Sequence, residues 1–189
     1  MVITYHNETC FKVVSGKVSA IVDPPNEKFK ADITLETRSK VSEIESKSGE
    51  VNIHGGGEYE VQEIAVRGIQ VHYDAKNDLA DVMYSVIIEG ISIFFMGNIS
   101  SAPSVEIMEN IGEVDILFIP VGKGFLDPKS AAKLVKQIQP RIIVPYPPQH
   151  VSAFLDEVGQ KCENMDKLVL KKKDIIEMGE KTKIICIKA

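Results

Sequence analysis

The stretch of residues 114–148 constrains the fold more than any other part of the chain. Residues 114–120 form a continuous apolar run, which predicts a strand buried on both faces. A glycine-rich turn follows, and Asp127 then begins a helix that Pro140 ends. Residues 141–144 predict a second strand. Strand, helix and strand in this order indicate a crossover between parallel strands, so a ligand site is expected beyond their carboxyl ends.

The rest of the chain is strand-rich in its first half and alternates strand with helix in its second. The helices are expected at 104–111, with Ser104 as the cap, and at 151–158. Residues 37–49 predict an exposed loop or short helix, 74–81 a charged loop, and Lys171 to Lys173 a solvated turn. The further strands are expected at 1–5, 10–14, 17–22, 31–36, 50–53, 58–64, 65–73, 83–88, 91–96, 167–170 and 183–187. Two sheets with helices on their outer faces satisfy this pattern.

Composition restricts the class of protein. A chain of 189 residues predicts one domain over 1–189, and 44% hydrophobic with 26% charged residues is typical of a globular protein. The net charge of −5 argues against a nucleic-acid partner, and the apolar runs are too short to cross a membrane. Three scattered cysteines indicate no disulfide framework and predict a reducing, cytoplasmic location. No signal peptide is expected at the N-terminus.

Two glycine-rich motifs invite a catalytic interpretation that the sequence does not complete. His54 precedes three glycines, as in the oxyanion loop of esterases, but the chain has no Gly-x-Ser-x-Gly pentapeptide. Residues 121–124 place Lys123 between two glycines without the phosphate-loop pattern. No two of the four histidines have the spacing of a local chelate, so each is interpreted as a surface or hydrogen-bonded histidine.

Asp23 is the most informative single residue. It ends a predicted strand and is followed by two prolines, which places a carboxylate on a rigid scaffold over the sheet. The sequence leaves two uses open: hydrogen bonds to nearby backbone amides, or service as a ligand.

Together these segments resemble the metallo-β-lactamase superfamily, in particular its small single-domain, zinc-dependent hydrolase-like proteins. The resemblance extends over nearly the whole chain. Its most specific segments are 9–11, 21–24, 31–33, 57–61, 114–122, 127–132 and 140–145. It implies an α/β fold, a four-layer αβ/βα sandwich with a metal basin at one edge of two sheets.

The resemblance also implies where the metal ligands of the family would lie, and other residues occupy those positions. The family's His-x-His-x-Asp-His motif corresponds to a segment that contains Arg38, Lys40, Ser42 and Glu43. A later histidine corresponds to Tyr73, next to His72. The remaining positions of this vestigial basin are Glu8 for an early histidine, Asn98 for the bridging aspartate, Pro147 for the last histidine, and Asp23, which the family uses to support the site from behind.

Charged guanidinium and ammonium groups do not ligate zinc, and proline has no donor atom. We therefore predict no catalytic residue, no metal ligand and no cofactor. One hypothesis is that Arg38 or Lys40 fills the space of the metals and pairs with Asp23 or Glu43, so that Lys40→Ala would destabilise the protein strongly.

Three interpretations of function stay open. The main one is a binding or structural module without the dinuclear zinc site, with an unknown ligand or protein partner or as a homo-oligomer. The alternative is a metal-dependent hydrolase with a rearranged, weak or mononuclear zinc site. Its ligands would come from Glu8, Asp23, Glu43, His72 and Asn98, with a register slip that brings His72 into the place of Tyr73. The third is a partner in nucleic-acid processing, because some relatives in the family act on RNA; the acidic charge and the lack of an appended clamp domain argue against it.

Overall fold

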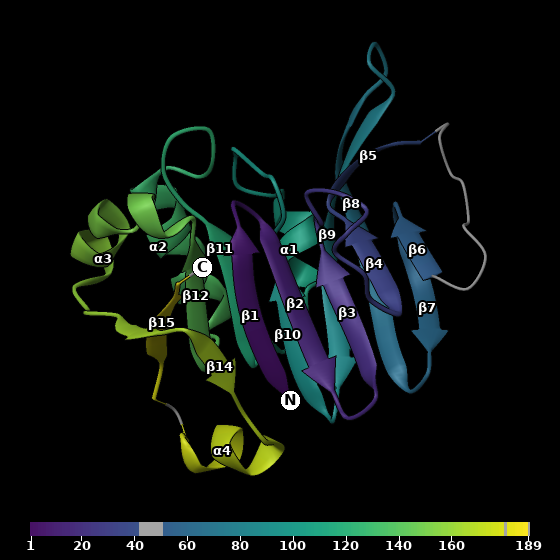
Figure 1. The fold of residues 1–189 in the computed structure, drawn as a ribbon. Helices are drawn as coiled ribbons and strands as arrows, with labels where there is room; N and C mark the ends of the chain where they lie inside the picture. Colours follow the sequence, from purple (N-terminus) through teal and green to yellow (C-terminus); the bar gives the residue numbers. More distant parts are fainter. Residues whose placement is uncertain (42–50, 180, 189) are drawn as a thin grey trace.

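The computed structural model describes residues 1–41, 51–179 and 181–188, and two facing sheets form its body (Figure 1). The first sheet has six strands, and the second has nine. In spatial order the first sheet contains β14 (Lys167–Val169), β1 (Val2–Asn7), β2 (Cys10–Ser15), β3 (Val18–Val22), β4 (Ile33–Glu36) and β6 (Val51–His54). The second contains β13 (Glu163–Met165), β15 (Lys183–Ile187), β12 (Ile142–Tyr146), β11 (Ile116–Pro120), β10 (Ile91–Phe95), β9 (Leu79–Ile88), β8 (Ile64–Asp74) and β7 (Gly57–Val61), and β5 (Arg38–Lys40) pairs with β9.

The predicted crossover is confirmed. Strands β11 and β12 are parallel, and helix α2 (Pro128–Ile138) connects them. The Asp127 carboxylate caps this helix by accepting from the backbone N–H groups of Lys129 and Ser130. All five residues of each strand are buried, as a continuous apolar run in the middle of a sheet requires.

The two faces of the second sheet belong to different hydrophobic clusters. Its inner face packs against the first sheet around Phe11, Phe95 and Phe118, whose rings are in contact. Its outer face is covered by α1 (Val105–Glu109), α2 and α3 (Ser152–Val158). The two-sheet α/β fold that the resemblance implies is thus confirmed, and among the described residues its helical cover lies on the second sheet. On the outer face of the first sheet, Phe29 packs over a small cluster of Cys10, Ile21 and Ala31.

Two predicted loops are corrected by the structure. Residues 38–40 form strand β5 instead of a loop, and Thr37 and Ser39 are buried because β5 pairs with β9. Strand β9 begins at Leu79, inside the predicted loop 74–81. The segment 42–49 of the first predicted loop lies outside the described residues.

The C-terminal region also differs from its prediction. Lys172 and Lys173 belong to a short helix, α4 (Lys172–Glu177), instead of a solvated turn. The Lys172 ammonium lies 2.9 Å from the carboxylate of Asp115, which also lies 3.5 Å from Arg141 Nε, so this lysine attaches α4 to the body. No helix in the described part of the chain is long and apolar enough to cross a membrane.

Candidate functional site

The candidate site lies where the parallel strands of both sheets end. In the first sheet β3, β4 and β6 are parallel, and in the second β10, β11 and β12 are parallel. Their carboxyl ends meet at the upper edge of the sandwich in Figure 1. Asp23 follows β3, Thr37 follows β4, and Asn98 lies three residues after β10. This edge is the place where sheets of this type position ligand-binding side chains.

The Asp23 carboxylate accepts hydrogen bonds from three neighbouring residues. Thr37 donates twice, through its backbone N–H at 2.7 Å and its hydroxyl at 2.6 Å. The Asn98 side-chain amide donates to the same carboxylate at 3.3 Å and to the Thr37 hydroxyl oxygen at 3.0 Å. The Thr9 side chain forms a further bond to Asp23. We call Thr9, Asp23, Thr37 and Asn98 the Asp23 network; because Asn98 comes from the second sheet, the network ties the two sheets together.

The packing around Thr37 leaves no room for change. Its side chain is fully buried, and Gly97 approaches it so closely that an added Cβ would lie 2.6 Å from the Thr37 Cβ. Gly97 also has a φ of +68°, which favours glycine. Its carbonyl accepts a hydrogen bond of 2.8 Å from the buried Tyr146 hydroxyl. The segment that carries Asn98 is therefore held by backbone and side-chain contacts at once.

Burial raises the pKa of Asp23 to about 6, and the negative charge of Glu36 adds to the increase. The hydrogen bonds from Thr37 and Thr9 act in the opposite direction. Burial, followed by the Asp23 charge, raises the pKa of the Cys10 thiol to about 11, which keeps it protonated and unreactive at neutral pH. Of the two uses of Asp23 left open by the sequence, hydrogen bonding is the one present, with side chains as well as with the backbone.

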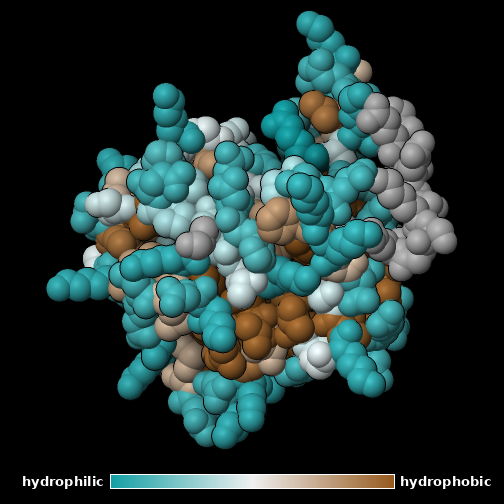
Figure 2. All heavy atoms as spheres, in the orientation of Figure 1, coloured by the Kyte–Doolittle hydropathy of each residue, from teal (hydrophilic) through white to brown (hydrophobic). Residues whose placement is uncertain are grey.

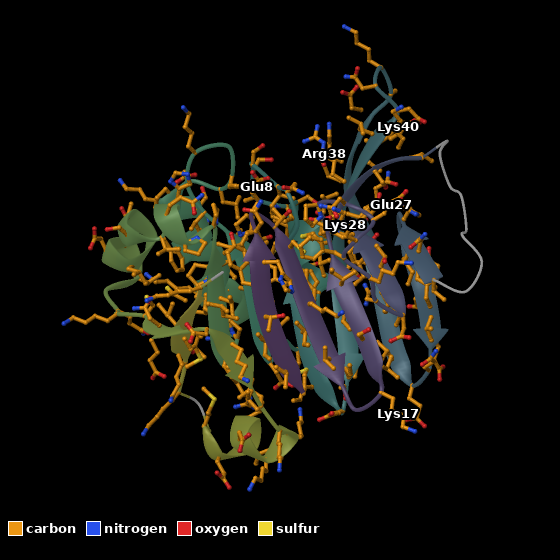
Figure 3. All side chains as sticks on the ribbon, viewed as in Figure 1. Glu8, Lys17, Glu27, Lys28, Arg38 and Lys40 are labelled. Carbon is orange, nitrogen blue, oxygen red and sulfur yellow. The ribbon has the colours of Figure 1, made fainter. Side chains whose placement is uncertain are left out.

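Arg38 does not pair with Asp23. It lies on β5, and its Nε is 3.6 Å from the Asp81 carboxylate on the neighbouring strand, so the hypothesis that it fills the basin and pairs with Asp23 is wrong. Lys40 is exposed on the same strand. Figure 3 shows Glu8, Arg38 and Lys40 at the same end of the sandwich, with Lys17 at the other end. Ser42 and Glu43 lie outside the described residues.

His72 and Tyr73 lie on the upper part of β8, which projects beyond the sandwich as a hairpin with β9 (Figure 1). Both side chains are exposed, and the Tyr73 hydroxyl donates to Asp78 at 2.8 Å. A register shift in the β8–β9 pairing falls between Gln70 and His72 and sets His72 opposite Asp81. The strand therefore contains an irregularity of the kind the alternative interpretation needs, but neither side chain reaches the Asp23 network in the described contacts.

The last two predicted positions lie near the same edge. Pro147 is buried directly after β12. Glu8 is exposed in the turn after β1, and its carbonyl accepts from the Tyr5 hydroxyl at 3.2 Å. Among the predicted basin residues that the structure describes, Asp23 and Asn98 are joined by a hydrogen bond.

Sequence reasoning missed three residues of the site: Thr9, Thr37 and Gly97. Thr37 was placed in a polar loop, although the threonine directly follows the strand that ends in Glu36. The signal that could have identified Thr37 is its hydroxyl at the end of a predicted strand, next to the strand that ends at Asp23. A second pair was also missed, since His54 Nδ1 lies 3.2 Å from the Glu36 carboxylate on the neighbouring strand.

The described residues do not fit a dinuclear zinc centre. Such a centre needs imidazoles and carboxylates with free lone pairs, whereas the implied positions hold groups such as Arg38, Lys40 and Asn98. Asp23, which the resemblance places behind the metals, accepts hydrogen bonds from Thr37 and Asn98. Across residues 1–41, 51–179 and 181–188, no three His, Cys, Asp or Glu side chains gather closely enough to hold a metal ion.

Residues 2–147 match the model of the β-lactamase superfamily domain. The chain belongs to this superfamily. A metal-dependent hydrolase of the UPF0173 group from Thermococcus onnurineus is 30% identical over an alignment of 104 residues that covers 50% of this chain and 45% of that protein. The aligned part thus spans less than half of the relative, so the relative's activity is not carried over by the match itself.

Solved structures of the superfamily share the fold. A candidate zinc-dependent hydrolase from Thermotoga maritima superposes with a TM-score of 0.78 at 20% identity, over 98% of this chain and 97% of that one. A metallo hydrolase from Ignicoccus hospitalis superposes with a TM-score of 0.65 at 14% identity, over 90% of this chain and 99% of that one. At these identities the likeness establishes the fold alone, and the metallo-β-lactamase fold predicted from the sequence is confirmed.

Proposed function

We propose that this chain is a non-catalytic binding or structural module of the metallo-β-lactamase superfamily that works without a dinuclear zinc centre. The Asp23 network is the observation that carries the proposal. Its carboxylate binds Thr37 and Asn98 at 2.6–3.3 Å, and Asn98 occupies the position at which the resemblance implies the bridging aspartate. An uncharged amide at position 98 donates to Asp23 instead of bridging two cations.

The chemistry of the implied ligand positions supports the same proposal. Family hydrolysis depends on a metal that converts bound water into hydroxide near neutral pH. Arg38 remains protonated under all ordinary conditions and therefore cannot act as a metal ligand. A partner, a ligand and a homo-oligomeric state remain predictions for this chain.

A metal-dependent hydrolase with a rearranged, weak or mononuclear site is the second candidate. The naming of the Thermococcus onnurineus relative as a metal-dependent hydrolase favours it. Within the described chain, His54 with Glu36, and His72 on the irregular part of β8, are the residues from which such a site would start.

A hydrolysis assay with matched variants separates the two candidates. Purified protein is assayed with a chromogenic cephalosporin, p-nitrophenyl acetate and bis(p-nitrophenyl) phosphate, with EDTA and then with Zn²⁺, Mn²⁺ or Fe²⁺. We expect rates equal to those of the metal ion in buffer, unchanged in His54→Gln and His72→Gln. Turnover that rises with metal and falls at least about tenfold in either variant would establish the hydrolase instead.

A further inference from the structure

Two of the three cysteines of the chain lie next to each other at one edge of the second sheet. Cys186 is a buried residue of β15, and Cys162 is half-buried directly before the edge strand β13. In the parallel pairing of these strands Asn164 lies opposite Cys186, so Cys162, two residues earlier, is on the same face of the sheet. Both side chains accordingly pack in the hydrophobic cluster of the outer face. The third cysteine, Cys10, belongs to the first sheet.

The thiols of Cys162 and Cys186 interact directly, because the side chain of Cys162 forms a hydrogen bond with that of Cys186. Burial, followed by this hydrogen bond and the charge of Cys162, raises the pKa of the Cys186 thiol to about 12. In residues 1–41, 51–179 and 181–188, no group of three His, Cys, Asp or Glu side chains could hold a metal ion. Structural zinc sites take four such ligands, so an isolated thiol pair fits disulfide chemistry better than metal binding.

The two thiols differ in their access to solvent. Cys186 is 3% exposed, whereas Cys162 is half-buried in the connection between α3 and β13. A dissolved reagent therefore reaches Cys162 first, and Cys186 is available only to a sulfur that already lies beside it. Cys10 is 1% exposed and has no cysteine next to it in the described hydrophobic clusters, so the same reagent should leave it reduced.

A bond between these sulfurs would close a loop that contains β13, β14 and α4. Short contacts hold this segment: β13 pairs with β15 over three residues, and β14 pairs with β1 over three residues. The ion pair of Lys172 with Asp115 attaches α4. Figure 2 shows hydrophobic side chains at the surface above α4, over the lower ends of β14, β1 and β2. A covalent link at the Cys162–Cys186 contact would therefore strengthen a lightly attached part of the fold.

We propose that Cys162 and Cys186 form a reversible disulfide by exchange with a low-molecular-weight disulfide, and that this bond fastens β13 to β15. The Cys162 thiolate attacks one sulfur of the small disulfide, and the released thiolate takes up the proton that Cys162 lost. The Cys186 thiol then gives up its proton and attacks Cys162 Sγ, which releases the second small thiol. Two electrons thus pass from the protein dithiol to the small disulfide, which becomes two thiols. The site goes beyond the proposed function, because neither cysteine belongs to the Asp23 network.

Incubation of the folded full chain with excess glutathione disulfide, followed by acid quench and intact-mass spectrometry, tests the proposal. We expect the wild type to lose the mass of two hydrogens, to yield linked peptides of Cys162 and Cys186 after non-reducing digestion, and to recover its mass in dithiothreitol. Cys186→Ala should stop at the mixed disulfide, with one glutathione on Cys162, whereas Cys162→Ala should stay unmodified. Cys10→Ala is the matched control and should form the disulfide as the wild type does. Oxidation should raise the Tm by roughly 5–10 °C in the wild type and leave it unchanged in Cys162→Ala.

Three results would overturn the proposal: a wild type that keeps its reduced mass, one that accumulates the glutathione adduct without forming the internal bond, or a disulfide that involves Cys10 or a second chain. Cys162→Ser, at a half-buried position, is a second variant that should fold and lack the disulfide. Thr37→Val alters only the Asp23 network and should form the disulfide normally, so failure here and failure of the proposed function are separable.

Discussion

Replacement of Thr37 by valine tests the Asp23 network while it preserves the shape of a fully buried side chain. The change removes the 2.6 Å hydroxyl bond to the Asp23 carboxylate and the 3.0 Å bond from the Asn98 amide. A hydrogen bond to a charged group contributes about 1.5–3 kcal/mol and a neutral one about 0.5–1.5 kcal/mol. The backbone N–H of residue 37 still donates to Asp23. We therefore expect the free energy of unfolding at pH 7 to fall by roughly 2–4 kcal/mol.

Urea denaturation followed by circular dichroism measures this loss, and thermal denaturation should show a Tm lower by roughly 5–15 °C for a protein of this size. Thr34→Val is the matched control, because Thr34 is a buried threonine on β4 whose side chain makes no hydrogen bond in the described structure. The control should change stability by less than about 1 kcal/mol. Equal effects of the two substitutions would refute the idea that the Thr37 hydroxyl takes part in a structural network.

Two further substitutions examine the same region. Gly97→Ala should lower the free energy of unfolding by about 1–3 kcal/mol for the clash with Thr37 and by about 1–2 kcal/mol more for the left-handed backbone. Gly90→Ala is the control, because Gly90 has a φ of +70° and open space around the added Cβ, so only the backbone cost of about 1–2 kcal/mol applies. Equal losses of stability in urea denaturation would contradict the packing argument. The raised pKa of Asp23 means that the folded protein binds this proton more tightly than the unfolded chain, so the contribution of Asp23 to stability falls as pH rises from its ordinary pKa of 3.8 to about 6. Asp23→Asn should remove this pH dependence. The free energy of unfolding of the wild type minus that of the variant should therefore change by up to about 3 kcal/mol between pH 4 and pH 7. The same difference at both pH values would show that the pKa of Asp23 in the folded protein is not raised.

The sequence predicts the parts of the fold that depend on local patterning. A continuous apolar run such as 116–120 is typical of a central strand that is buried on both faces. Asp127 directly before a helix is a typical N-cap, and its carboxylate caps α2 in the structure. The resemblance then supplied the arrangement of the sheets, since the segments that carry it are distributed over strands, turns and the start of helix α2 along most of the chain.

The errors arise where tertiary contacts override local composition. The polar sequence from Thr37 to Lys40 resembles a loop, but residues 38–40 pair with β9 as a strand, and Thr37 before them is fully buried. Lys172 resembles a solvated residue until Asp115, distant in sequence, comes within 2.9 Å. From the sequence alone, Asp23 or Glu43 was the expected ion-pair partner of Arg38. The pairing of β5 with β9 instead places Arg38 beside Asp81.

The candidate site was half predictable for the same reason. Asp23 and Asn98 were identified because they occupy positions with a role in the family. Thr9, Thr37 and Gly97 were not, because threonine and glycine carry no signal for ligation. Their function here is to donate hydrogen bonds and to permit close approach, and both depend on how the two sheets meet.

Metal content is the measurement that tests the central claim most directly. Untagged protein is purified once with and once without zinc in the growth medium, dialysed, and analysed by inductively coupled plasma mass spectrometry. The account predicts a zinc, iron and manganese stoichiometry near zero per chain in both preparations. Retention of close to one or two equivalents, lost in His54→Gln or His72→Gln, would contradict it and establish a metal site built from other residues than those of the family.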